Sequence, residues 1–137
     1  MSSKKFLAGG IAGGIAYFLL GYLVFGVLLM DFMKTHSNST AGVYRTEGDM
    51  IWWSMVVGNL AYGFLLSYVI GKAGAHSVGG GFKTGLITAL LVSTTNNCIM
   101  YALANLTDTT GMVVDIAAST VEGAIVGAIV GWVQSKV

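Results

Sequence analysis

The 137-residue sequence has few charged residues and no proline. Only 9% of its residues are charged, against about 25% in an ordinary soluble domain. Disordered chains are rich in charge and poor in apolar residues, so 55% hydrophobic residues exclude disorder as well. The net charge of +1 provides no basic field for nucleic acid. A mean hydropathy of +0.76 and 20 glycines are instead typical of helices packed closely in lipid.

Cysteine and histidine are too scarce for the familiar metal and nucleophile sites. Cys98 is the single cysteine, so it has no partner for a disulfide within the chain. His36 and His76 fall on opposite sides of the membrane in the topology derived below, so they cannot share a zinc ion or a haem in one subunit. Neither histidine is placed for a catalytic triad with a serine or the cysteine. The sequence therefore predicts no metal, no cofactor and no enzyme activity.

Apolar stretches long enough to cross a bilayer cover most of the chain. Charged residues bound four of them, at residues 6–30, 51–70, 84–106 and 112–133. About 20 apolar residues suffice for a hydrocarbon core of roughly 30 Å, so each can form a transmembrane helix. A soluble four-helix core is the alternative, but a chain this short cannot cover four apolar faces without lipid or partners. We predict one all-α domain over residues 1–137, an integral membrane bundle of four helices.

The basic residues set the orientation of this bundle. Five of the seven fall in the termini and in the loop 71–83, and two fall in the loop 31–50. By the positive-inside rule, both termini and the loop 71–83 are therefore cytoplasmic, and the loop 31–50 is outside. The loop 31–50 has room for a small cap or an interfacial helix, and a solvated connection is the alternative. We expect a multi-pass protein of a bacterial cytoplasmic membrane.

The inner loop 71–83 is rich in glycine and includes Gly79-Gly80-Gly81-Phe82-Lys83. This pattern has some likeness to a phosphate-binding loop, but such a loop needs a preceding strand. We therefore expect a flexible hinge or a tight turn at the membrane surface.

Polar residues lie at a similar depth in all four spans. Glu122 lies ten residues into the fourth span, about 15 Å below its outer end at about 1.5 Å per residue. The same count places five further polar residues near this level: Tyr17, Tyr22, Asn59, Asn96 and Asn97. A charged group there costs at least about 2.5 kcal/mol. Glu122 should therefore face protein or water, or stay protonated and donate a hydrogen bond to an asparagine.

The fourth span has two distinct polar or small faces. At about 100° per residue, Asp115, Ser119 and Glu122 share one narrow stripe. Glycines of two spans form tracks that let helices approach closely, namely Gly123, Gly127 and Gly131 in the fourth and Gly9, Gly10, Gly13 and Gly14 in the first. We expect the glycine faces to drive assembly, including assembly of a homo-oligomer. The acidic stripe should face a different neighbour or a cavity.

The third span carries five consecutive polar residues at positions 93–97. Five successive positions surround the whole helix, so no rotation leaves this turn apolar. Serine and threonine can bond to carbonyls of the preceding turn, whereas asparagine amides do so less readily. Asn96 and Asn97 therefore predict that the third helix is central in the bundle or lines an interface.

Two functions fit this polar layer. In the first, Glu122 binds a proton or a cation with Asn59, Asn96 and Asn97 as ligands, while Asp115 and Ser119 lead outward. In the second, the layer only holds helices together through hydrogen bonds, and the protein is an accessory subunit of a larger membrane complex. Four helices leave no wide pore, so transport requires a homo-oligomer or a narrow crevice. Partners are the bilayer and either copies of the chain or other membrane subunits.

The whole chain also resembles the bacterial four-span proteins of domain-of-unknown-function family seventeen-sixty-one. The features that carry the resemblance are Gly21-Tyr22 with Phe25-Gly26, Asn96-Asn97, and Asp115 at the start of a span rich in small residues. Where the family has a Trp-Tyr pair, this sequence has Gly21-Tyr22. The resemblance implies a small bacterial inner-membrane protein and assigns no activity.

Overall fold

The computed structural model describes residues 2–36, 48, 50–104 and 107–137. Arg45, Glu47 and Asp49, and with them most of the loop 31–50, lie outside the described residues. The described chain folds into five α-helices and one π-helical turn: α1 (Ser3–Leu23), η1 (Val24–Leu28), α2 (Met30–His36), α3 (Trp52–Ala73), α4 (Val78–Leu103) and α5 (Thr109–Lys136). The protein is thus all-helical over these residues, as predicted.

Four of the helical segments are long and apolar enough to cross a membrane. They are Ser3–Leu28, Trp52–Ala73, Val78–Leu103 and Thr109–Lys136. Each extends past at least one end of the span predicted for it, because capping residues lie beyond the apolar stretch. This set of helices suggests a multi-pass membrane protein.

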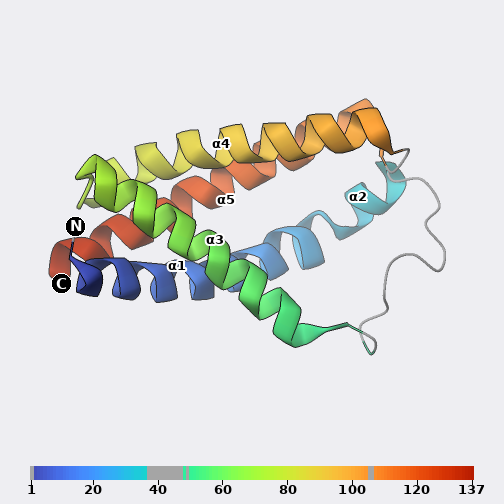
Figure 1. Cartoon of the computed structure of the whole chain (residues 1–137). Coiled ribbons are helices and arrows are strands. Elements are labelled where there is room, and N and C mark those ends of the chain that lie inside the picture. Colours follow the sequence, from blue (N-terminus) through green and yellow to red (C-terminus); the bar gives the residue numbers. More distant parts are fainter. Residues whose placement is uncertain (1, 37–47, 49, 105–106) are drawn as a thin grey trace.

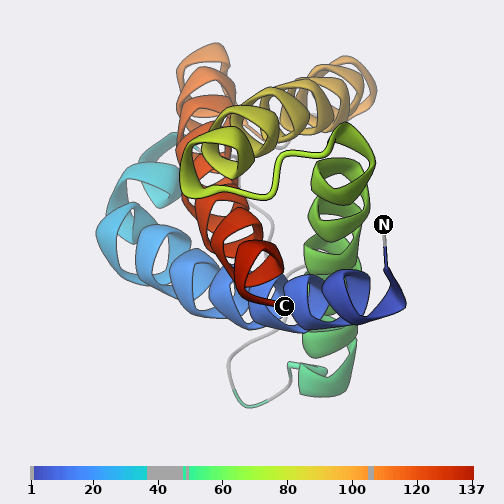
Figure 2. The ribbon, with the colours of Figure 1, turned by 90° about the vertical axis from the view of Figure 1, so that its left-hand side faces the viewer.

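The helix α5 is the central element of the bundle. It packs along α4 over most of its length and also contacts α1 and α3, while α1 packs on α3. Figure 2 shows α5 between α1, α3 and α4 when the bundle is seen from the end that holds both termini. The turn between α3 and α4 lies at this same terminal end, and α2 lies at the opposite, far end (Figure 1). The third span is therefore not central, since α4 lies at the side of the bundle, and the alternative that it lines an interface stays a prediction.

Side-chain caps set where the helices begin. Ser77 caps α4 by accepting a hydrogen bond from the amide of Gly80 at 2.9 Å, and Asp108 caps α5 by accepting one from Gly111 at 2.7 Å. The left-handed Gly74 (φ 68°) ends α3. Only residues 74–77 are left between α3 and α4, so the predicted loop 71–83 is much too long. The glycine-rich segment after Ser77 is the first turn of α4 and not a flexible hinge.

The predicted glycine faces are buried, and they pack helices of one chain together. A Cβ added to Gly127 would collide with the backbone of Gly81 and lie 2.8 Å from the Cα of Gly85. The glycines of α4 and α5 therefore bring these two backbones into direct contact. On α1, Gly9 and Gly13 lie against both α3 and α5, whereas Gly10 and Gly14 face α3. All seven predicted packing glycines are buried within the chain.

Candidate functional site

Most of the polar residues singled out in the sequence line one cavity. Its volume is about 200 Å³, and four helices contribute to its wall. We call it the acidic cavity and define it by the residues that line it: Tyr17, Tyr62, Val92, Ser93, Asn96, Asn97, Asp115, Ser119 and Glu122. Because α5 is central, its acidic stripe reaches both α4 on one side and α1 and α3 on the other.

The two acids of the cavity lie on α5, seven residues or about two turns apart. Asp115 is held by Asn97, whose side-chain amide donates to its Oδ2 at 2.7 Å and to the carbonyl of Ser93 at 2.8 Å. Glu122 is only 5% exposed, and its carboxyl has no hydrogen-bond partner among the described residues. The described residues that line the cavity include no basic side chain, so neither acid is neutralised by an ion pair there.

The first span leaves room for the Glu122 carboxyl. A Cβ added to Gly21 of α1 would lie 3.3 Å from Glu122 Oε1, closer than an ordinary van der Waals contact. Three residues later α1 widens into the π-helical turn η1, and such turns occur frequently at functional sites. The first span therefore approaches the Glu122 carboxyl at Gly21, where a side chain would be crowded.

Two tyrosines form the aromatic part of the wall. The rings of Tyr17 and Tyr62 are 4.4 Å apart between centroids and inclined at 56°. Tyr17 is 7% exposed, and its hydroxyl is buried without a hydrogen-bond partner among the described residues. Buried polar groups are nearly always paired, so this hydroxyl is available to a bound molecule or a water.

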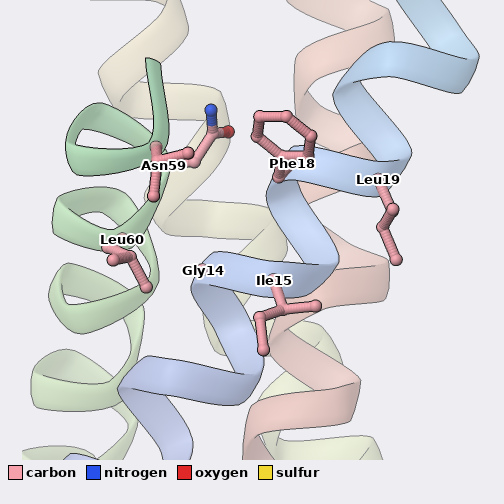
Figure 3. Close-up of a pocket in the computed structure, with 7 residues that line it drawn as sticks. Gly14, Ile15, Phe18, Leu19, Asn59 and Leu60 are labelled. Carbon is pink, nitrogen blue, oxygen red and sulfur yellow. The ribbon is translucent and has the colours of Figure 1, made fainter. Parts of the chain in front are cut away.

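Asn59 does not belong to this cavity. Its amide donates to the carbonyl of Met55 at 2.8 Å, one turn back on its own helix. Its side chain lies in a separate apolar groove between α3 and α1, near Phe18 (Figure 3). Asn59 therefore does not line the acidic cavity, whereas Tyr62, three residues along the same helix, does. Tyr22 is likewise exposed and does not line the cavity.

The cavity is closed toward the terminal end and open at its side. Between Glu122 and the terminal end, the interior is filled by fully buried apolar side chains, namely Leu66, Ile70, Val126 and Val130. Asn96, in contrast, is exposed, so the wall that α4 contributes ends at a surface. The site is thus a crevice in the far half of the bundle and not a pore through it.

A second polar cluster, which sequence reasoning missed, ties the terminal end together. Gln134 of α5 is fully buried, and its Nε2 donates to the carbonyl and the hydroxyl of Ser67 on α3, both at 2.9 Å. This orientation leaves Oε1 to accept from His76 Nδ1 at 2.9 Å. Ser67 in turn donates to the carbonyl of Phe6, and Lys5 donates to the carbonyl of Gln134. The polar residue near the end of the fourth span was the signal available in the sequence.

At the far end, a side-chain hydrogen bond joins α2 to the start of α5. His36 Nδ1 lies 2.7 Å from Asp108 Oδ2, and the backbone amide of Asp108 donates to the carbonyl of His36. The hydrogen bond from the Gly111 amide, and next the one from His36, hold the pKa of Asp108 below its ordinary value. Asp108, Asp115 and Glu122 follow one another at intervals of seven residues, so acids recur every two turns from the far end to the cavity.

Among the described residues, no group of three or more His, Cys, Asp or Glu side chains is placed to hold a metal ion. No family model, curated protein or solved structure matches this chain. The resemblance to domain-of-unknown-function family seventeen-sixty-one stays a prediction. The acidic cavity is the feature of the molecule that indicates a function.

Proposed function

We propose that this chain is a multi-pass protein of a bacterial cytoplasmic membrane that binds a proton or a small cation in the acidic cavity and conducts it across the bilayer. The observation that supports this most strongly is that Asp115 and Glu122 face one cavity without a basic partner among its described lining residues. Acids at such depth are costly, so they are usually retained where they serve an ion pathway or a proton relay.

The distribution of charge supports the orientation proposed. Five lysines belong to the terminal end: Lys4, Lys5, Lys72, Lys83 and Lys136. None of the four acids among the described residues, Asp31, Asp108, Asp115 and Glu122, lies at this end. With the terminal end in the cytoplasm, the acidic cavity occupies the outer half of the membrane, and Asp108 lies at the outer surface.

Conduction requires a movement, because the apolar residues around Val126 and Val130 close the cavity on the cytoplasmic side. This movement would have to separate α1 and α3 from α5 on the cytoplasmic side of Glu122. A cation site that is reached from one side at a time is the arrangement expected of a transporter and not of an open channel.

The test is flux into liposomes that contain the purified protein. Glu122→Gln keeps the size of the side chain and removes its charge, so we expect it to abolish proton or cation flux. Asp31→Asn, which neutralises an acid of α2 outside the cavity, is the matched control and should conduct like the wild type. Equal flux from Glu122→Gln and wild-type protein, with both folded by circular dichroism, would contradict the proposal.

The alternative function is that of a structural subunit in a larger membrane complex. The fully buried apolar residues around Val126 and Val130 favour it, because they close the cavity toward the terminal end. Asn96 favours it as well, since its exposed amide has no hydrogen-bond partner within the described part of the chain. A partner helix, from another copy or another protein, would cover this amide. Native mass spectrometry after gentle solubilisation distinguishes the two: multiples of 14.3 kDa indicate a homo-oligomer, and foreign subunits at a fixed ratio indicate an accessory role.

A further inference from the structure

We infer that the acidic cavity accepts a small organic ammonium ion, of about the size of choline or tetramethylammonium. This inference rests on the proposed function, because it names the chemical class of the cation that the same site binds. It is drawn from the volume of the cavity, from its aromatic wall and from the unpaired hydroxyl of Tyr17.

The volume of the acidic cavity is too large for a metal ion without its water and too small for a large drug. A cavity of about 200 Å³ holds roughly six or seven waters at about 30 Å³ each. An inorganic cation that is stripped of its water needs oxygen ligands in direct contact on all sides, which a space of this size does not provide. Pockets for drug-sized ligands have volumes of roughly 300–1,000 Å³, and this cavity is smaller. A cation with a handful of carbon atoms fits between these limits.

The chemistry of the wall matches such an ion. Asp115 and Glu122 supply negative charge without a competing base, and Glu122 has no partner of its own among the described residues. Tyr17, Tyr62 and Val92 supply aromatic and apolar surface. Acids beside aromatic rings are the combination that recognises alkylammonium groups, because the rings attract the cation electrostatically and tolerate its methyl groups. The Tyr17 hydroxyl can accept a hydrogen bond from an N–H or O–H group of the ligand.

The experiment is isothermal titration calorimetry on the full-length protein in lipid nanodiscs, in mildly alkaline buffer. The probes are choline and its neutral carbon isostere 3,3-dimethyl-1-butanol, with potassium chloride as the inorganic cation. We expect choline to bind at least tenfold more tightly than either of the other two. This comparison uses the wild-type protein, so it does not depend on whether any variant folds.

Variants then assign the binding to the cavity. Glu122→Gln should weaken choline binding by at least about tenfold, because it removes the nearest unpaired charge. Asp31→Asn should leave binding unchanged. Tyr62→Phe keeps the ring and should bind nearly as the wild type, whereas Tyr62→Leu should bind several-fold more weakly.

Three results would overturn the inference. They are equal binding of choline and its isostere, tighter binding of potassium than of choline, and binding of choline that Glu122→Gln leaves unchanged. If choline does not bind while Glu122-dependent proton or potassium flux persists, the organic-cation inference fails and the proposed function stands. If both choline binding and Glu122-dependent flux are absent, the proposed function fails with it.

Discussion

The close approach of α4 and α5 makes a quantitative prediction about one glycine. The three atoms nearest to a Cβ on Gly127 all belong to the backbone of Gly81 or Gly85, so the contact cannot be relieved by moving a side chain. Gly85 Cα would lie 2.8 Å away, whereas carbon atoms prefer a separation of about 3.5–4.0 Å. The two helices would have to shift apart by about 1 Å. Overpacking of this kind costs about 1–3 kcal/mol.

A matched glycine isolates this packing cost. Gly58 lies inside α3, and a Cβ there would meet nothing within 4 Å. Replacing a helical glycine by alanine gains about 1 kcal/mol of helix propensity at either site, so this gain cancels in the comparison. We expect Gly127→Ala to be about 1–3 kcal/mol less stable than Gly58→Ala. Unfolding in mixed detergent micelles, followed by circular dichroism, measures the difference. Equal stabilities would refute the claim that α4 and α5 are in backbone contact.

Three further predictions concern polar residues. Gln134→Leu keeps the approximate volume of the side chain but removes its hydrogen bonds to Ser67 and His76. It should therefore lower the free energy of unfolding by about 1–3 kcal/mol in the same assay. A stability equal to that of the wild type would contradict the role of this hydrogen-bond network. The pKa of Asp108 is lowered in the folded protein, so its contribution to stability is present above its ordinary pKa of about 4 and is lost as the pH falls through the lower folded value. Asp108→Asn should flatten the acid limb of the stability–pH curve, and an unchanged limb would contradict this. Asn59→Leu removes only a hydrogen bond within its own helix, so this variant should keep the flux that depends on Glu122. Loss of flux from a folded Asn59→Leu protein would show that Asn59 takes part in the cation pathway.

The sequence could predict the features that helix geometry alone determines. Asp115, Ser119 and Glu122 share a face because positions three or four apart on any helix do so, and the structure places all three on one cavity. Asn97 reaches Asp115 because the short connection between α4 and α5 makes these helices antiparallel neighbours. These inferences need no knowledge of the rest of the fold.

The features that depend on rotation and on distant contacts could not be predicted in this way. Counting residues gives the depth of Asn59 but not the direction in which it points, and Tyr62 one turn away faces the cavity instead. The hydrogen bond between Lys5 and Gln134 joins positions 129 residues apart, so no local sequence pattern predicts it. The glycine tracks correctly predicted close packing of helices, but they did not show that the helices they pack against belong to the same chain.

The central claim is that Glu122 lies in a cation-attracting crevice in the far half of the bundle. The most direct test is the labelling of Ser119→Cys, in a Cys98→Ser background, by membrane-impermeant thiol reagents that differ only in charge. We predict that the cationic reagent reacts much faster than the anionic one from the outer side, and that Glu122→Gln reduces this preference. The account is contradicted if Ser119→Cys does not react from the outer side, or if both reagents react at the same rate.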